Sequence, residues 1–436
     1  MAERFNILYL HSHDTGRYVQ PYGYAVPTPN IQRLAEEGVL FRQCFCAGPT
    51  CSPSRAALLT GMYPHSCGMT GLAHRGWRLN DYRQHIVHTL KKEGYYTALF
   101  GTQHVAPHAE VARIGYDQVM PDGSAQERTR AAIDFLTNAP PQPFFISVGY
   151  TETHREFPSP DPTVADERYC RPPATLPDTP ETRRDMAGFI TSARILDDCY
   201  GQILNALEQT GLAANTLVIC TTDHGPAFPG MKCTLTDHGI GVLLIMRGPG
   251  GFTGGRVIEA LVSHLDIFPT LCDLLGIVPP TWLQGYSLMP LIRGEKAAIR
   301  EHVFAEVTYH AAYEPQRGVR TTRYKYISRF DARSTAVLPN CDDSLSKDLW
   351  LRHGWRERPQ AQEYLFDLIW DPNEANNLAD RPETQPVLEE MRNRLIRWMQ
   401  ETNDPLLNGP VPAPAGAVVN DPNGLSPRER PQPAHP

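Results

Sequence analysis

A run of eleven residues near the start of the chain could position a nucleophile. Residues 51–61 read Cys-Ser-Pro-Ser-Arg-Ala-Ala-Leu-Leu-Thr-Gly. Pro53 suits the first turn of a helix, and the alanines and leucines after it propagate one. The free N–H groups at the start of such a helix would face an anion bound beside Cys51. Arg55, one turn further on, could brace the nucleophile or a neighbouring oxyanion, so this segment is the first candidate for catalysis.

Two polar clusters could hold a divalent cation near this nucleophile. His11-Ser12-His13-Asp14 follows the first predicted strand, and Asp223-His224-Gly225 follows a later one. Because the carboxyl ends of parallel strands meet at one edge of a sheet, both clusters are expected at the same edge. A cation there would lower the pKa of a nucleophilic hydroxyl and neutralise charge on a transferred group. His11 lies one pleat before His13, so we expect it behind the ligands.

The elements that must position these residues follow from the hydrophobic pattern. Short apolar runs alternate with helical patterns through the first two thirds of the chain. This predicts an α/β fold with a mostly parallel central sheet sandwiched by helices. A helix is predicted at 28–38, and the aperiodic loop at 158–180 is expected to shape a substrate pocket. The predicted strands are 5–10, 96–100, 144–150, 217–222 and 242–246.

The pattern changes after Ile292, which predicts a second domain. We therefore divide the chain into a catalytic domain at 1–292 and a smaller C-terminal α+β domain at 293–408, with an antiparallel sheet and a packed helix. The segment 409–436 is rich in proline and has no apolar face, so we expect it to be disordered. The predicted elements of the second domain are strands at 303–307, 324–328 and 364–368 and a helix at about 383–402.

The overall composition excludes several classes of protein. The formal net charge is −7, whereas nucleic-acid-binding proteins usually carry a basic excess, so we expect no nucleic-acid partner. No stretch approaches the roughly 20 apolar residues that span a bilayer, and the first residues lack the apolar core of a signal peptide. We expect a cytoplasmic protein that does not contact membranes. The chain has ten cysteines, without metal-ligand spacing. Apart from Cys51, they are expected to be small buried residues.

The nucleophile segment resembles the signature of the sulfatase family, which begins Cys-x-Pro-x-Arg and closes on Thr-Gly. This family belongs to the alkaline phosphatase superfamily, which implies an alkaline phosphatase-like fold. The resemblance implies that a formylglycine-generating maturation enzyme oxidises Cys51 to an aldehyde, which hydrates to a geminal diol. One hydroxyl attacks sulfur and expels the leaving group, and deprotonation of the other then ejects sulfate by C–O cleavage. The implied reaction is hydrolysis of a sulfate ester or sulfamate, with release of inorganic sulfate.

The family resemblance also implies the metal ligands. Carried over by position, they are His13, Asp14, Asp223 and His224. Two of them depart from the usual pattern, because most sulfatases have aspartate at the position of His13 and asparagine at that of His224. An all-oxygen site, as the resemblance implies, suits calcium, whereas two imidazoles with two carboxylates favour manganese, zinc or iron. We expect one divalent metal ion, with its identity open.

Three further residues match family positions that contact the sulfate group. The resemblance implies that His104 bonds the formylglycine diol and acts as base, that His154 donates to the leaving atom, and that Lys232 binds a sulfate oxygen. Thr102 stands where the family has a lysine, so one cationic contact is missing. Arg155, another basic residue or the metal could replace this contact; otherwise the preferred group carries less charge.

Within the family, the chain most resembles the heparan N-sulfatase, or sulfamidase, branch. Sulfamidases cleave an N–S bond, and the leaving amine needs a proton that a charged His154 could supply. The implied substrate is a small sulfated or sulfamated molecule, with a sugar as one candidate. The outer pocket could be lined by Glu152, His310 and Arg317. The segments that carry the resemblance are 103–107, 228–229 before Lys232, 306–308, 371–378 and 401–405.

Two other functions stay open. The same scaffold could hydrolyse phosphonate or phosphate monoesters, as related formylglycine enzymes with a histidine-bearing metal site do. The second alternative is a binding protein on an inactive scaffold, suggested by Thr102 and the unusual ligands. The presence of Cys51, Arg55, Asp14 and Asp223 argues against it. The oligomeric state is also open, with a homo-oligomer among the options.

Overall fold

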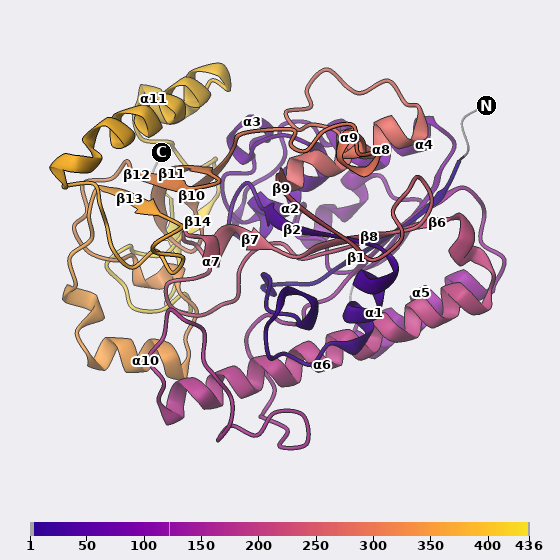
Figure 1. Cartoon of the computed structure of the whole chain (residues 1–436), viewed down its shortest axis with the longest axis horizontal. Helices are drawn as coiled ribbons and strands as arrows, with labels where there is room; N and C mark the ends of the chain where they lie inside the picture. Colours follow the sequence, from indigo (N-terminus) through magenta and orange to yellow (C-terminus); the bar gives the residue numbers. More distant parts are fainter. Residues whose placement is uncertain (1–3, 122, 435–436) are drawn as a thin grey trace.

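A large mixed sheet forms the centre of the molecule (Figure 1). The computed structural model describes residues 4–121 and 123–434. Within this part of the chain, the sheet has the strand order β4-β3-β5-β1-β6-β8-β2-β7, and β9 pairs with β2. The bounds are β1 (Asn6–His11), β2 (Val39–Phe45), β3 (Tyr96–Gly101), β4 (Gln118–Met120), β5 (Phe144–Gly149), β6 (Thr216–Thr221), β7 (Gly241–Val242), β8 (Leu244–Arg247) and β9 (Arg256–Ser263).

Most strand pairings in this sheet are parallel. β1 pairs in parallel with β5 and β6, β3 with β4 and β5, and β2 with β9. β8 is antiparallel to β6 and β2, and β7 is antiparallel to β2. The predicted strand at 242–246 is interrupted at Leu243, whose N–H donates to the carbonyl of Gly16 instead of the ladder. The predicted α/β class is confirmed.

Helices cover both faces of the sheet. Successive residues of a strand point to opposite sides, so each strand contributes apolar side chains to two cores. Leu8 and Leu10 of β1 belong to the core under α1, α5 and α6, whereas Ile7 and Tyr9 face the core under α2, α4 and α8. Among the described residues, no helix is both long and apolar enough to cross a membrane. The bounds are α1 (Pro29–Glu37), α2 (Cys51–Thr60), α3 (Pro64–Cys67), α4 (Ile86–Lys92), α5 (Ala125–Thr137), α6 (Pro180–Gln209), α7 (Asp237–Ile240), α8 (Ile267–Leu275) and α9 (Met289–Ile292).

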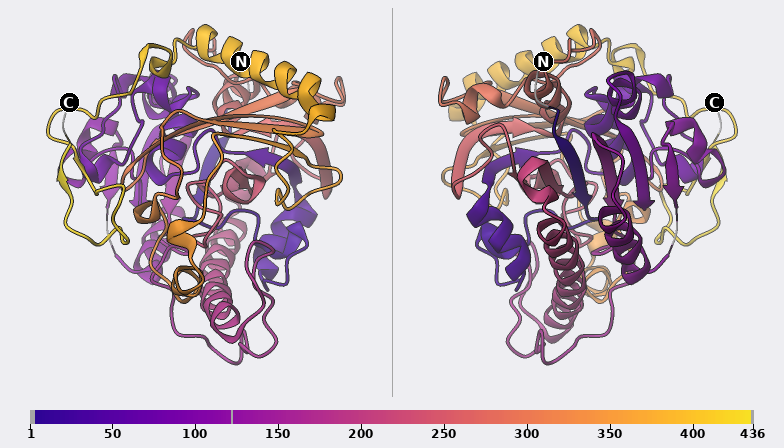
Figure 2. Two further views of the ribbon diagram at one scale, coloured as in Figure 1. Left: turned by 90° about the vertical axis from the view of Figure 1, so that its left-hand side faces the viewer. Right: turned by 90° about the vertical axis from the view of Figure 1, so that its right-hand side faces the viewer.

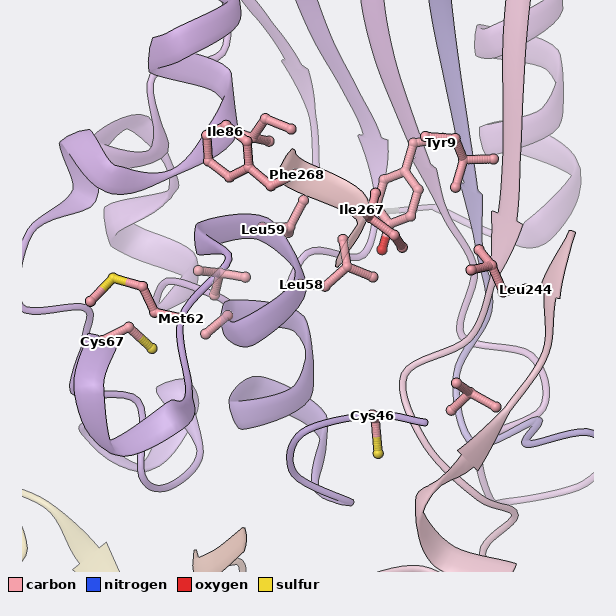
Figure 3. Close-up of a cluster of buried hydrophobic side chains, with 14 of the residues drawn as sticks. Tyr9, Cys46, Leu58, Leu59, Met62, Cys67, Ile86, Leu244, Ile267 and Phe268 are labelled. Carbon is pink, nitrogen blue, oxygen red and sulfur yellow. The ribbon is translucent and has the colours of Figure 1, made fainter. Parts of the chain in front are cut away.

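Helix α2, which begins at Cys51, is fixed by packing along its whole length. All of its residues are buried, and Gly61 ends it in a left-handed conformation with φ of 68°. Figure 3 shows Leu58 and Leu59 facing α8 and Tyr9 of the central sheet. A buried leucine contributes about 2–3 kcal/mol, so these contacts hold the start of α2 in a defined place.

The C-terminal region forms an antiparallel sheet with a helix packed on it, as expected (Figure 2). Strand order is β10-β11-β12-β13. One face of α11, including Leu388, Met391, Leu395 and Trp398, packs against this sheet. Helix α10 contacts α6 of the larger domain. The bounds are β10 (His302–Tyr309), β11 (Tyr313–Thr321), β12 (Tyr324–Arg329), β13 (Glu363–Asp367), α10 (Leu345–Arg352) and α11 (Gln385–Glu401).

The proline-rich segment from residue 409 differs from the expectation of disorder. Its described part, 409–434, contains a two-stranded pair of β14 (Val418–Val419) and β15 (Gln432–Pro433). The side chains of Val411 and Ala417 are buried, and the Tyr309 hydroxyl donates to the carbonyl of Val411. The segment shows no apolar periodicity because it packs as an irregular strip on other elements, with scattered small residues as its contacts.

Replacing Trp398 with alanine should destabilise the C-terminal region. Its indole stacks on Phe304 with ring centroids 4.8 Å apart and meets Tyr63 edge-on at 4.9 Å. We expect the free energy of unfolding, measured by urea denaturation, to fall by about 3–5 kcal/mol. Trp370→Ala, which removes an indole that is 83% exposed, should cost less than about 0.5 kcal/mol. Equal losses in both variants would contradict this account of the packing.

Candidate active site

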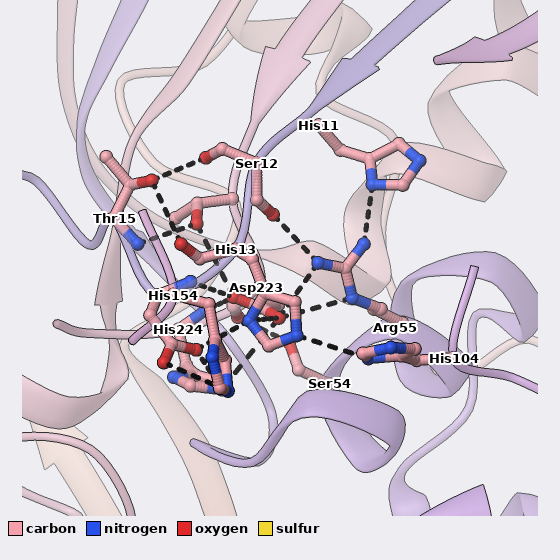
Figure 4. A network of polar contacts seen from close by, with 12 residues as sticks. His11, Ser12, His13, Thr15, Ser54, Arg55, His104, His154, Asp223 and His224 are labelled. Atoms are coloured by element: carbon pink, nitrogen blue, oxygen red, sulfur yellow. Dashed lines mark hydrogen bonds and ion pairs between the residues drawn. The ribbon is translucent and has the colours of Figure 1, made fainter. Parts of the chain in front are cut away.

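The two predicted polar clusters meet at one edge of the sheet. His11 of β1 lies beside Thr221 of β6 in parallel register, so the residues that follow both strands leave the sheet together. Figure 4 shows His13, Asp223 and His224 converging there, with Arg55 of α2 reaching in from the side. The parallel pairing of β1 and β6 thus brings together residues more than 200 positions apart in the sequence.

The predicted metal ligands form one compact group. His13, Asp14, Asp223, His224 and Cys51 each offer a donor atom, and these atoms all lie within 4.8 Å of one another. His13 Nδ1 is 2.7 Å from Asp14 Oδ1 and 3.3 Å from Asp223 Oδ2. His224 Nε2 is 3.3 Å from Asp14 Oδ1. Ligands about 2 Å from a common metal ion lie about 3 Å apart, so this spacing fits a single ion.

His224 gives an independent test of that fit. Its Nδ1 is 3.0 Å from the carbonyl of Gly225 and therefore carries the hydrogen. Its buried Nε2 has no hydrogen-bond partner and faces two carboxylates with a lone pair. A lone pair directed at carboxylate oxygens is unfavourable unless a cation lies between them. Glycine is needed next in the sequence, because a Cβ at Gly225 would lie 1.9 Å from the carbonyl oxygen of His238.

The two carboxylates are fully buried and held in the charged form. Burial alone would raise the pKa of Asp14, but Lys232 and the neighbouring histidines hold it well below its usual range. Burial opposes the charge of Asp223 as well, and here His13, His224 and Arg55 lower the pKa. Asp14 has a φ of 56°, a left-handed conformation that costs about 1–3 kcal/mol outside glycine. The surrounding bonds therefore hold it in place.

Arg55 contacts the metal-ligand group rather than Cys51. Its guanidinium donates to Asp223 Oδ2 at 3.0 Å and to the carbonyl of Ser12 at 2.8 Å. It also donates to His11 Nδ1 at 2.5 Å. His11 lies behind Arg55 in this way, and its other ring nitrogen is 3.0 Å from Ser147 Oγ.

Cys51 lies at the first position of α2, close to the two carboxylates. The preceding residue, Thr50, has an extended conformation and makes no side-chain cap, so the first turn of α2 keeps N–H groups without partners in the helix, and the Cys51 side chain belongs to the group around Asp14 and Asp223. Burial, with a smaller effect of these carboxylates, raises the pKa of the Cys51 thiol. As a plain thiol it would stay protonated and be a weak nucleophile.

His104, His154 and Lys232, expected at the sulfate site, all border the metal-ligand group. His104 Nδ1 is 3.1 Å from His13 Nε2, and burial, with neighbouring His13, lowers the pKa of His104 well below its usual range. Lys232 Nζ donates to Asp14 Oδ2 at 2.9 Å. His154 Nε2 is 3.4 Å from Lys232 Nζ, and its side chain is 34% exposed. His154 is thus the histidine of this set that borders the open side.

Two residues near this site had no signal in the sequence. Asp342 Oδ2 is 2.9 Å from Lys232 Nζ, so it shares that cation with Asp14. His74 is solvent-accessible but flanked by protein, and this partial burial lowers its pKa together with the cations Arg75, His154 and Lys232. Neither residue lies in a recognisable motif, since each reaches the site from a loop distant in sequence.

Two arginines suggested from the sequence, Arg155 for the missing cationic contact and Arg317 for the outer pocket, are bound to other partners. Arg155 does not replace the missing lysine, because it donates to Asp185 at 2.6 and 2.8 Å and to the carbonyl of Ala227. Arg317 is fully buried between Asp404, at 3.0 Å, and Glu306, at 3.2 Å.

His310 and Glu152 were also suggested for the outer pocket. His310 is buried, and Glu152 contacts the site through its main chain. His310 is 5% exposed, with its N–H bonded to the carbonyl of Ala312. Glu152 accepts the N–H of His13 through its main-chain carbonyl at 3.0 Å, so it shapes the site through the backbone. Thr102 is also buried, and its N–H bonds the carbonyl of Gly149.

Comparison with known proteins identifies the class to which this site belongs. The sulfatase family model matches residues 6–277, more than half of the chain, so the chain belongs to the sulfatase family. It is a hydrolase that acts on sulfate esters or N-sulfates. A second model, N-sulphoglucosamine sulphohydrolase, C-terminal, matches residues 231–341. Human (Homo sapiens) N-sulphoglucosamine sulphohydrolase is 28% identical over 446 residues, which cover 88% of each chain.

Solved structures agree on the fold. A protein solved in complex with its substrate D-glucosamine-2-N,6-O-disulfate aligns with a TM-score of 0.72 at 20% identity, covering 94% of this chain and 99% of the other. The phosphonate monoester hydrolase of Agrobacterium radiobacter aligns with a TM-score of 0.70 at 22% identity, covering 92% and 96%. At these identities the likeness shows the fold alone.

His224→Ala should reduce the amount of bound divalent metal. The variant removes a donor whose lone pair has no other partner, so affinity should fall by about tenfold or more. Elemental analysis of purified protein after dialysis against a weak chelator measures the metal content per chain. His353→Ala removes the imidazole of an exposed residue directly after α10 and should keep the wild-type content. Unchanged metal in His224→Ala would argue that this group does not hold the ion.

Proposed function

We propose that this sulfatase is a sulfamidase, which hydrolyses the N–S bond of a small sulfated aminosugar and releases inorganic sulfate. The observation that carries the proposal is the match of residues 231–341 to the C-terminal domain of N-sulphoglucosamine sulphohydrolase. This stretch starts beside Lys232 and ends beside Asp342, the ion pair that borders the candidate metal ligands. The named human relative and the structure with bound glucosamine disulfate support a sugar as substrate.

We propose that Cys51 is oxidised to formylglycine by a maturation enzyme before the protein is active. The raised pKa of the thiol supports this, because an unmodified Cys51 would be a poor nucleophile. The hydrated aldehyde would supply two hydroxyls, one to bond sulfur and one whose deprotonation releases sulfate by C–O cleavage. The N–H groups at the start of α2 would stabilise the negative charge beside it.

We propose that His13, Asp14, Asp223 and His224 hold one divalent metal ion, manganese or zinc rather than calcium. Two imidazoles among four ligands support this choice, since calcium prefers oxygen ligands. The ion would lower the pKa of the diol hydroxyl and neutralise charge on the sulfuryl oxygens. The metal analysis described above should therefore find manganese or zinc, and one tightly held calcium per chain would contradict the assignment.

Each of the remaining polar residues would either transfer a proton or stabilise charge. Lys232, held by Asp14 and Asp342, would bind a sulfuryl oxygen more strongly as charge develops on it. His154, which borders the open side, would donate a proton to the leaving amine. His104, partly buried beside His13, would accept the proton of the second diol hydroxyl. Arg55 would position Asp223 and keep its charge compensated.

A panel of substrates tests the proposed function. Purified protein, coexpressed with a maturation enzyme and checked by the intact mass of the Cys51 peptide, is assayed on N-sulfoglucosamine, 4-nitrophenyl sulfate and phenyl phosphonate monoester. We expect kcat/KM for N-sulfoglucosamine to exceed that for the phosphonate by at least about a hundredfold. Cys51→Ser should fold and lose turnover.

The opposite preference would change the assignment. A phosphonate preference of orders of magnitude would establish the alternative, phosphonate or phosphate monoester hydrolysis. This alternative is suggested by the similar fold of the Agrobacterium enzyme and by the two histidine ligands. An unmodified thiol at Cys51 in an active preparation would contradict the formylglycine mechanism.

The role of His154 predicts a dependence on the leaving group. An amine leaves poorly without a proton, whereas 4-nitrophenolate leaves without one. His154→Ala should therefore lower kcat/KM for N-sulfoglucosamine by about 10²–10⁴-fold but that for 4-nitrophenyl sulfate by about tenfold or less. His104→Ala should instead lower kcat for both substrates and leave both kcat/KM values nearly unchanged, because His104 acts after the leaving group has gone. Equal losses on both substrates in His154→Ala would rule out its role as proton donor.

We also propose that the protein works in the cytoplasm. None of the ten cysteines, all in the described part of the chain, forms a disulfide, which suits a reducing compartment.

A further inference from the structure

A cavity of about 380 Å³ lies beside the candidate active site. Its walls come from four parts of the chain: the loop at 155–160, one face of α6 near Gly188, the start of α10 at 343–348, and Arg428 of the C-terminal segment. Cavities of about 300–1,000 Å³ hold small ligands. None of the roles proposed above uses this cavity.

Two walls of the cavity begin at residues next to the reaction centre. The loop at 155–160 follows His154 directly, and Asp343 follows Asp342, which pairs with Lys232 at 2.9 Å. His154 Nε2 and Lys232 Nζ are 3.4 Å apart. A leaving group that receives its proton from His154 must extend past this histidine, and the wall of the cavity begins at the next residue of the chain, Arg155.

The C-terminal segment contributes Arg428 to the wall of the cavity. Arg428 forms an ion pair with Glu156, and its Nε is 3.9 Å from Asp343 Oδ2. Ser426 Oγ also donates to Asp343. These contacts join the loop after His154 to the loop after Asp342, so residues 426–428 form a bridge between two walls of the cavity.

This bridge is anchored on the other side of the active site. Arg75, which follows His74, donates to Asn420 Oδ1 at 2.7 Å and to the carbonyl of Pro427 at 3.4 Å. The N–H of Asn420 donates to the carbonyl of Ala311 at 2.8 Å. The segment therefore has a fixed course past the site, although the Arg428–Glu156 pair itself is exposed, at 66% and 69% of the two side chains.

The charges around the cavity indicate the kind of ligand. Arg155 and Asp185 neutralise each other through two bonds of 2.6 and 2.8 Å. The other charged residues of the wall are of both signs and nearly balance: Glu156, Asp343, Asp348, Arg184 and Arg428. Such a wall offers hydrogen-bond donors and acceptors to hydroxyl groups, but it does not attract a chain of negative charges.

We propose that this cavity is a subsite for one sugar ring joined to the aminosugar that loses its sulfate, and that the bridge at Arg428 limits the substrate to a disaccharide. The inference rests on the proposed sulfamidase function. Substrates of this size are products of glycosidic-bond cleavage, so a depolymerising reaction on a longer chain must come before this one.

Filling the cavity tests the subsite. Leu345 lines it and is 41% exposed, so Leu345→Trp occupies the space without disturbing the core. The ratio of kcat/KM for an N-sulfated disaccharide to that for N-sulfoglucosamine should fall by about tenfold or more. The matched control, Leu407→Trp, places the same side chain at an exposed position outside the cavity and should keep the wild-type ratio.

Opening the bridge tests its limit on size. Arg428→Ala should raise the ratio of kcat/KM for an N-sulfated tetrasaccharide to that for the disaccharide by about fivefold or more. Arg430→Ala, at an exposed arginine with no ion pair within the described part of the chain, should leave this ratio unchanged. Thermal melting of all variants checks that each is folded.

The outcomes separate the inference from the function on which it rests. No turnover of N-sulfoglucosamine by matured wild-type protein would contradict the sulfamidase function. Turnover with a disaccharide-to-monosaccharide ratio that stays within about twofold of wild type in Leu345→Trp would overturn the subsite. An unchanged tetrasaccharide-to-disaccharide ratio in Arg428→Ala would overturn the role of the bridge.

Discussion

The juxtaposition of two buried carboxylates, Asp14 and Asp223, is the constraint that organises the rest of the structure. Each follows one of two neighbouring parallel strands, and both are shielded from water. A buried charge costs several kcal/mol unless it is paired, and two like charges together cost more. Arg55 takes one oxygen of Asp223 and Lys232 one oxygen of Asp14. Asp223 Oδ1 accepts the N–H groups of Asp14 and His224. Asp14 Oδ1 and the lone pair of His224 Nε2, 3.3 Å apart, leave a place that a cation would satisfy.

This requirement fixes the nucleophile as well. Arg55 can reach Asp223 only if α2 starts where it does, and the same start places Cys51 at the first turn of the helix, beside the two carboxylates. The packing of Leu58 and Leu59 on α8 then holds both residues in one geometry. The helix therefore supplies charge compensation and a reactive group together, which explains why the motif joins a cysteine to an arginine one turn later.

The sequence was informative where a local pattern carried the function. The strand ends after residues 10 and 222, and the helix at Cys51, were predictable because apolar runs, a first-turn proline and polar strand ends are short-range signals. The partners of Arg155 and Arg317 were not, since Asp185 and Asp404 lie 30 and 87 positions away. The order of residues 409–434 was missed for a similar reason, because its buried side chains are small and scattered.

The contacts of Lys232 also bear on where the catalytic unit ends. We expected a boundary near residue 292, but Lys232 lies before it and its second partner, Asp342, lies after it. Removing Asp342 would leave Asp14 as the one carboxylate paired with Lys232 among the described residues, while Asp14 is also a candidate metal ligand. The C-terminal region thus contributes charge to the reaction centre and, through Arg428, reaches the loop after His154. A sulfatase site of this kind is complete only when both regions are folded against each other, because neither alone compensates the buried charges.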